Sequence, residues 1–230
     1  MKVRQSDIGV IIVAGGRGTR MGASTPKQFL PLSERRCVLE VTVERFAQTL
    51  PGADIVVVLP ADSIASWHEI NSDHGFDVPH TTVAGGDTRF GSVAAGLAAL
   101  PHKELVAVTD GVRPFVTPEM ITRLIDEAAD YGSAVASLPV TDTLRRRCGE
   151  GSTSADRNEY FTVQTPQVFA HSVLQRAYTQ PFDERFTDDA SVVEALGLSV
   201  HYTTGDRGNI KLTTPEELVM ARAIYALRGL

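Results

Sequence analysis

The chain has 230 residues, of which 43% are hydrophobic and 22% charged, and its 22 basic and 28 acidic residues give a net charge of −6. This length predicts a single domain over residues 1–230 that buries its core without disulfides, and so acidic a chain is a poor match for general nucleic-acid binding. The two cysteines, Cys37 and Cys148, lack metal-site spacing, and no apolar run approaches the ~18 residues of a membrane span, so we expect a cytoplasmic protein with no membrane partner.

Short apolar runs rich in β-branched residues alternate with helical patterns along the first 140 residues. The predicted strands lie at 9–14, 55–59, 80–84, 105–108 and 133–140, and the predicted helices at 38–50, 61–71, 90–100 and from Thr117 onward. The last of these helices starts typically, with a capping hydroxyl, a first-turn proline and an acid near the positive end of the dipole. Strands that are apolar throughout are buried on both faces, so the pattern predicts a doubly wound α/β fold around a mostly parallel sheet.

The alternation breaks between Thr141 and Phe161, where the chain becomes polar, basic and rich in glycine and serine. This segment is compatible with a disordered loop, or with two ribbon strands around a turn at Gly149–Gly151 that project from the body. Regular structure is expected to resume at Thr162. Beyond it the sequence predicts a helix start at 187–189, strands at 200–204 and 209–213, and a last helix that opens at Thr214 with a capping box.

A glycine-rich stretch follows the first predicted strand directly, and it reads AGGRGTRMG from Ala14 and PKQFL from Pro26. Glycines let the backbone approach a ligand closely, and bare N–H groups there can cradle phosphate oxygens. Arg20 and Lys27 add positive charge. The sequence lacks the GxxxxGK[ST] pattern of a Walker A loop, and Met21 stands where a dinucleotide fingerprint needs its third glycine. We interpret the stretch as a phosphate-binding loop of another kind; the alternative is a turn with solvated cations.

Three further motifs follow later elements. The turn GGDTRFGS at 85–92 could wall a base pocket with Ser92 opening the next helix, or it could be a tight turn with Asp87 as the helix cap. Asp110 ends an apolar strand and is well placed for Mg²⁺, which prefers one or two carboxylates plus substrate phosphates; alternatively it only pairs with Arg113 and stiffens the turn. Lys211 lies on the predicted strand 209–213, either near the sheet centre or at an exposed strand end.

One acidic pair also has two interpretations. Asp188 and Asp189 could form a metal site, although acids at a helix N-terminus are common because they favour its positive dipole end. We prefer the helix-terminal interpretation.

The chain resembles the 2-C-methyl-D-erythritol 4-phosphate cytidylyltransferase family of the non-mevalonate isoprenoid pathway in an ordered set of motifs: AGGRGTRMG, PKQFLPL, GGDTRFGSV, TDGVRPFV, DTL, QTPQVF, FTDDASVVE and NIKLTTPEEL. The set runs from about Gly9 to Leu218, nearly the whole chain. The resemblance implies a Rossmann-like nucleotidyltransferase that joins CTP to a small sugar- or polyol-phosphate and releases pyrophosphate, with Mg²⁺ as cofactor. It also implies a homodimer in which a β-arm at about 141–161 swaps between subunits and places Arg157 in the neighbour's active site.

The resemblance assigns roles residue by residue. The catalytic residues would be Arg20, Lys27 and Lys211, and the metal ligand would be Asp110. The nucleotide would be bound by Ala14, Gly15, Gly16, Gly18, Gly86, Asp87, Ser92 and Asp110. The other substrate would be bound by Arg113, Thr143, Arg157, Thr165 and Lys211.

Two departures from the family pattern stand beside these assignments. The family often has histidine where this chain has Thr109, and its Asp-Thr-Ile-Lys reads Asp-Thr-Leu-Arg here, ending at Arg145; lysine and arginine differ in geometry. Ribitol-5-phosphate cytidylyltransferase, a close relative with the same chemistry, is an alternative, although the DDASVVE stretch favours methylerythritol phosphate. A non-catalytic nucleotide sensor is a second alternative. The argument against it is the presence of Arg20, Lys27, Asp110 and Lys211.

Overall fold

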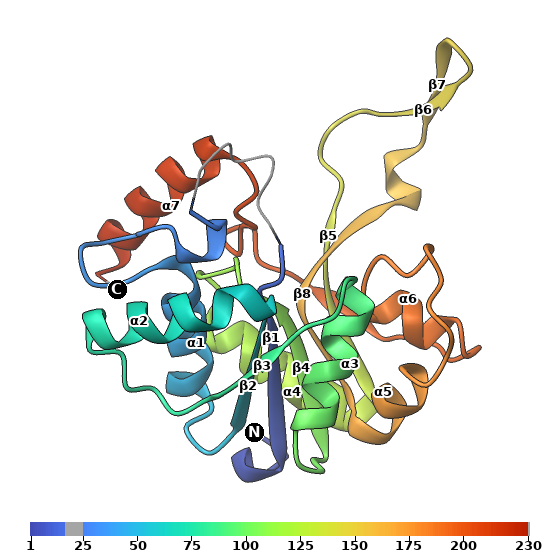
Figure 1. The fold of residues 1–230 in the computed structure, drawn as a ribbon. Coiled ribbons are helices and arrows are strands. Elements are labelled where there is room, and N and C mark those ends of the chain that lie inside the picture. The colour runs from blue at the N-terminus through green and yellow to red at the C-terminus, as the bar shows by residue number, and fades with distance from the viewer. Residues whose placement is uncertain (17–24, 230) are drawn as a thin grey trace.

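The computed structural model describes residues 1–16 and 25–229. Its largest feature is a seven-stranded sheet in the order β3-β2-β1-β4-β8-β5-β9 (Figure 1). These strands are β1 (Ile8–Val13), β2 (Asp54–Leu59), β3 (Thr81–Ala84), β4 (Leu105–Asp110), β5 (Ser133–Pro139), β8 (Phe161–Ala170) and β9 (Tyr202–Thr204). Only β8 runs antiparallel to its neighbours, β4 and β5. The prediction of a mostly parallel sheet is therefore confirmed.

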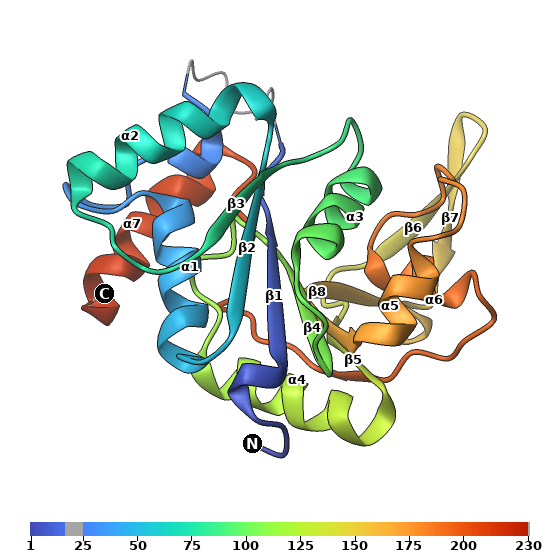
Figure 2. The same cartoon turned by 60° about the horizontal axis from the view of Figure 1, so that its bottom comes forward.

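Helices cover both faces of this sheet (Figure 2). They are α1 (Val38–Thr49), α2 (Ile64–His74), α3 (Arg89–Ala99), α4 (Pro118–Tyr131), α5 (His171–Ala177), α6 (Asp189–Glu194) and α7 (Pro215–Arg228). Successive residues of β1 face opposite cores: Val10 and Ile12 pack in the core that α1, α2 and α4 share, and Ile11 packs on the side of α3, α5 and α6. The continuous apolar sequence of β1 follows from this burial on both faces. None of the described helices is long and apolar enough to cross a membrane.

Helix α3 lies very close to the sheet because Gly96 faces it. A Cβ atom added at Gly96 would lie 2.6 Å from Ile11 Cγ2 and 3.1 Å from Val58 Cγ2. The helix begins above the carboxyl ends of the strands, where the Thr88 hydroxyl accepts a hydrogen bond from the backbone N–H of Gly91. Thr88 is therefore the N-cap, and the alternative in which Asp87 caps this helix is wrong.

The odd segment of the sequence forms a ribbon rather than an unstructured loop. Strands β6 (Leu144–Cys148) and β7 (Gly151–Ala155) pair antiparallel in a sheet of their own and project from the body (Figure 1). The turn between them contains Gly149 at φ +55°, a left-handed conformation that glycine adopts at low cost. At the base of the ribbon, large apolar side chains are exposed: Tyr160 by 48%, Phe161 by 50% and Val163 by 37%.

The predicted strand at 209–213 is wrong, because this segment contains no strand. Asn209 is fully buried, and its Nδ2 donates to the backbone carbonyl of Thr165 at 2.8 Å. The backbone carbonyl of Asn209 accepts from Nη1 of Arg113 at 2.8 Å and from Nε2 of Gln164 at 3.4 Å. The backbone carbonyl of Asn209, which would bond a neighbouring strand in a sheet, is therefore bonded by side chains instead. These bonds hold the irregular segment that contains Lys211.

Candidate active site

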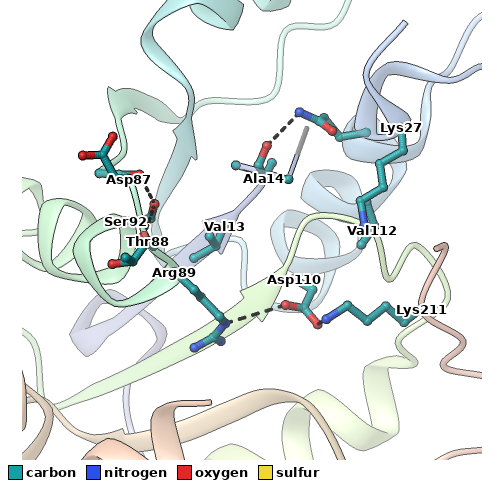
Figure 3. Close-up of a pocket in the computed structure, with 14 residues that line it drawn as sticks. Val13, Ala14, Lys27, Asp87, Thr88, Arg89, Ser92, Asp110, Val112 and Lys211 are labelled. Atoms are coloured by element: carbon teal, nitrogen blue, oxygen red, sulfur yellow. Dashed lines mark hydrogen bonds and ion pairs between the residues drawn. The ribbon is translucent and has the colours of Figure 1, made fainter. Parts of the chain in front are cut away.

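A cavity of about 250 Å³ lies at the carboxyl ends of β1, β3 and β4, between the N-terminus of α3 and the segment that carries Lys211 (Figure 3). This is the edge at which ligands bind in parallel α/β sheets. All of the described residues that the sequence assigned to nucleotide binding or catalysis meet here. The lining consists of Val13, Ala14, Gly15, Gly16, Lys27, Gln28, Gly86, Asp87, Thr88, Arg89, Ser92, Asp110, Val112 and Lys211.

One wall of the cavity is the glycine stretch after β1. The backbone carbonyl of Ala14 accepts from Nε2 of the buried Gln28 at 2.8 Å, which fixes the chain where it leaves the strand. A Cβ atom at Gly16 would lie 3.3 Å from Cε and 3.7 Å from Nζ of Lys27. The glycine thus lets the ammonium group approach the backbone closely, as a phosphate site requires. Gly18 and Arg20, also assigned to this loop, lie outside the described residues.

The opposite wall is the turn that leads from β3 into α3. Ser92 is the fourth residue of α3 rather than its start, and its side chain is buried. Its hydroxyl donates either to the carbonyl of Thr88 at 2.9 Å or to that of Gly86 at 3.3 Å. The serine therefore holds the turn in shape. Asp87 lines the cavity beside it.

Positive charges converge on Asp110 at the floor of the cavity. Its Oδ2 lies 3.0 Å from Nζ of Lys211 and 3.2 Å from Nε of Arg113, and its Oδ1 lies 4.0 Å from Nε of Arg89. Burial by itself raises the pKa of Asp110, but the charges of Lys211, Arg89 and Arg113 outweigh it and lower the pKa to about 2. The carboxylate is thus ionised at neutral pH. The pair with Arg113 does form, but as one of several contacts rather than as the only one.

The cavity can accommodate a magnesium ion only with help from a ligand. Among the described residues, no group of three or more His, Cys, Asp or Glu side chains could hold a metal. Asp110 offers Oδ1, whose ion pair with Arg89 is long at 4.0 Å, whereas Oδ2 is engaged by Lys211 and Arg113. One carboxylate oxygen plus substrate phosphates is an arrangement that magnesium commonly adopts. The residues present therefore fit such an ion.

Two residues assigned to the second substrate lie beneath Asp110 instead of lining the cavity. Thr165 is buried, and its hydroxyl accepts from the backbone N–H of Asp110 at 3.0 Å and lies 3.2 Å from Oγ1 of Thr109. Arg113 is also buried and bridges Asp110 and the carbonyl of Asn209. In this chain Thr165 fixes the backbone of Asp110, and Arg113 holds its carboxylate. Thr109, where the family often has histidine, is fully buried behind it and does not line the cavity.

Two further residues that the sequence assigned to the second substrate lie on the projecting arm. Thr143 and Arg157 are exposed, and Nη1 of Arg157 donates to the carbonyl of Thr141 at 2.6 Å. Neither contributes to the lining of this chain's own cavity.

Arg89 is the main cavity residue to which the sequence assigned no role. Its Nη1 and Nη2 donate to the two carboxylate oxygens of Asp189 at 2.9 and 2.6 Å. Asp188 caps α6 and Asp189 is the first residue of that helix, so the helix-terminal interpretation of this acidic pair is confirmed. The signal that could have indicated a role for Arg89 is its position at the start of the helix that follows the third strand.

Comparison with known proteins identifies similar sequences along nearly the whole chain. A family model described as IspD, 2-C-methyl-D-erythritol 4-phosphate cytidylyltransferase, matches residues 8–226. The enzyme of that name from Porphyromonas gingivalis is 48% identical over 216 residues, which are 93% of this chain and 96% of the relative. The one from Bacteroides fragilis is 46% identical over 214 residues, 93% and 97% of the two chains.

Solved structures of similar proteins point to the same family. The 2-C-methyl-D-erythritol 4-phosphate cytidylyltransferase of Thermus thermophilus superposes with a TM-score of 0.75 at 32% identity over 96% of this chain and 99% of the other. The 4-diphosphocytidyl-2C-methyl-D-erythritol synthase of Anaerococcus prevotii gives 0.80 at 26% identity over 96% and 97%. Together with the fold and the cavity described above, these matches show that the chain belongs to the IspD family of 2-C-methyl-D-erythritol 4-phosphate cytidylyltransferases.

Proposed function

We propose that this chain transfers the cytidylyl group of CTP to the phosphate of 2-C-methyl-D-erythritol 4-phosphate, giving 4-diphosphocytidyl-2-C-methyl-D-erythritol and pyrophosphate. The family and the names of its relatives support this activity. The structural observation that carries it is one cavity in which a glycine loop with Lys27 faces the pair formed by Asp110 and Lys211. Such a cavity can bind a triphosphate at the glycine loop and a second phosphate near Lys211.

The reaction is an in-line attack of an acceptor phosphate oxygen on the α-phosphorus of CTP, and the bond to pyrophosphate breaks. A phosphate monoester is anionic near neutral pH, so the attacking oxygen needs no strong general base. The protein must hold two mutually repelling anions together and neutralise the transition state. Lys27 and Lys211, which both line the cavity, supply positive charge for this task. Arg20, by the family resemblance, would add to the charge at the triphosphate.

Magnesium is the cofactor that we propose, with Asp110 as the protein ligand. When bound, the ion would neutralise phosphate charge. Asp110 would present Oδ1 to it while Lys211 and Arg113 hold Oδ2. The wall formed by Gly86, Asp87 and Ser92 would enclose the cytosine.

We also propose that the chain works as a homodimer in which the arm of one subunit completes the cavity of the other. A two-stranded ribbon is at best marginally stable in water by itself, and β6 and β7 pair only with each other in their sheet. The exposed Tyr160, Phe161 and Val163 at its base offer an apolar contact surface. Thr143 and Arg157 would then reach the acceptor phosphate from the partner subunit. The cytoplasmic location stays a prediction from composition.

Pyrophosphate release tests the activity and separates the alternatives. The purified chain is supplied with CTP and Mg²⁺, together with methylerythritol phosphate in one reaction and ribitol 5-phosphate in another. We expect release with the first acceptor alone. Release with ribitol 5-phosphate alone would make the chain a ribitol-5-phosphate cytidylyltransferase. CTP binding without release in either reaction would indicate a nucleotide sensor.

A further inference from the structure

Arg89 lies between two carboxylates that belong to different parts of the fold, Asp189 and Asp110. Figure 3 shows its approach to Asp110. It is the first residue of α3, and its side chain is only 27% exposed. Both terminal nitrogens donate to Asp189, at 2.9 and 2.6 Å, in a two-pronged contact. Its remaining nitrogen, Nε, faces Oδ1 of Asp110 at 4.0 Å. The guanidinium therefore bridges the start of α6 and the end of β4.

Asp189 is held in this position from behind. Its side chain is fully buried, and its Oδ1 accepts a 2.6 Å hydrogen bond from the hydroxyl of Tyr178. Asp188, not Asp189, caps α6, so the Asp189 carboxylate is not used by the helix end. The ring of Tyr178 stacks on Phe90, the neighbour of Arg89, with ring centroids 4.7 Å apart. Tyr178 thus contacts both the neighbour of Arg89 and the carboxylate that binds Arg89.

This arrangement makes Arg89 a poor binder of free anions. The charge of Asp189 compensates its own, and each of its terminal nitrogens already donates one hydrogen bond to that carboxylate. The Nε edge of the guanidinium faces Oδ1 of Asp110, whereas Lys211 and Arg113 contact Oδ2 of the same carboxylate. A carboxylate held from both edges keeps one orientation, and fixed orientation of charged groups contributes strongly to catalysis of phosphoryl transfer.

We propose that Asp189 and Tyr178 are positioning residues, which hold Arg89 against Asp110 and so fix the carboxylate in the orientation that the reaction uses. The inference rests on the proposed function for its kinetic consequence. It predicts that weakening the network slows the chemical step but leaves CTP binding nearly intact, because neither residue lines the cavity.

Two graded variants test it, each with a matched control. Tyr178→Phe removes one hydrogen bond to Asp189, and Tyr202→Phe removes the equivalent bond from a tyrosine hydroxyl to Glu194 on the same helix. Asp189→Asn removes the charge that holds Arg89, and Asp183→Asn does the same to the exposed pair of Asp183 with Arg185. We expect kcat to fall about fivefold in Tyr178→Phe and at least ~50-fold in Asp189→Asn. The KM for CTP should stay within about twofold in both, and both controls should match the wild type.

Mn²⁺ binding to the CTP complex, followed by electron paramagnetic resonance, gives a second readout that does not depend on turnover. Asp189→Asn should weaken it several-fold relative to Asp183→Asn, because Asp110 would lose its fixed orientation. The inference is overturned if kcat in both variants equals that of the controls, or if kcat, the CTP KM and the melting temperature all change together. If the wild type proves inactive with methylerythritol phosphate, the proposed function fails, and unchanged Mn²⁺ affinity in Asp189→Asn would then overturn the inference as well.

Discussion

Asp110 carries a negative charge in a buried position, and its environment predicts a pH-dependent contribution to stability. Its pKa is lowered from the ordinary 3.8 to about 2. A lowered folded-state pKa stabilises the fold at pH values above the unfolded one, and this contribution is lost as the pH falls from about 4 to about 2. We therefore expect Asp110→Asn to reduce the free energy of unfolding near pH 7 by about 2 kcal/mol, with a deficit that shrinks below about pH 4.

Urea denaturation of the wild type and Asp110→Asn across this pH range measures the effect. Asp62→Asn, at an exposed position, serves as control. A deficit of the same size at every pH would contradict the ionised, cation-bound state of Asp110.

Lys27 should be required for turnover. It supplies positive charge beside Gly16 at the proposed triphosphate wall, whereas Lys211, the other lysine among the described lining residues, pairs with Asp110. We expect Lys27→Ala to lower kcat at least ~100-fold, the scale for loss of a major electrostatic stabiliser. Lys2→Ala removes a lysine that pairs with Asp130 at the surface, and it should have wild-type kinetics. A folded Lys27→Ala protein with near-normal turnover would refute the assignment.

Single residues were predictable from the sequence where their position depends on the nearest strand. Lys27, Ser92 and Asp110 follow the carboxyl ends of strands along one edge of the sheet, so local pattern was enough to bring them to one cavity. The part played by Arg89 could not be predicted in this way. It depends on Asp189, which is 100 positions away in the sequence, and only the packed fold brings the two together.

At the scale of elements, the irregular segment 205–213 should matter as much as a regular strand would. Asn209 anchors it through Thr165 and Arg113, and Lys211 reaches Asp110 two residues later. Loss of a buried hydrogen-bonding partner costs about 1–3 kcal/mol. We expect Asn209→Ala to lower the free energy of unfolding by that amount and to reduce kcat, because Lys211 is no longer held.

Urea denaturation and steady-state kinetics measure both effects, with Asn71→Ala in α2, away from the cavity, as control. If Asn209→Ala kept the wild-type kcat despite its lower stability, Lys211 would be positioned without help from this anchor.

Helices and strands were predicted accurately where the nearby sequence alone determines them. Strands β1, β2 and β4 were predicted within two residues at each end, because each is an apolar run buried on both faces. Strand β8 was not delimited, since it inserts antiparallel between β4 and β5 and pairs with residues far away in sequence. The segment 209–213 has the composition of a strand, but Asn209 and its partners are bonded by side chains instead.

For the molecule as a whole, the central question is whether one chain is enough to build the site. The cavity within this chain contains no residue of the arm, and Arg157 is exposed. If the arm serves the partner subunit, then Lys27 and Arg157 of one chain act in two different active sites. If it folds back on its own body instead, both act in the same one. These two arrangements differ in what a mixture of variants can do.

Subunit mixing distinguishes them. Lys27→Ala and Arg157→Ala proteins are each expected to be nearly inactive as homodimers. When they are unfolded together at equal amounts and refolded, half of the dimers are mixed, and each mixed dimer has one site with both residues intact. We therefore expect recovery of roughly a quarter of the wild-type activity if the arms cross in a twofold-symmetric dimer. The double variant Lys27→Ala/Arg157→Ala, refolded with the wild type, is the control. If the arms cross, its mixed dimers have no intact site, and the wild-type homodimers alone leave roughly a quarter of the wild-type activity; arms that fold back would leave roughly half. No recovery in the first mixture would mean that Arg157 acts within its own chain.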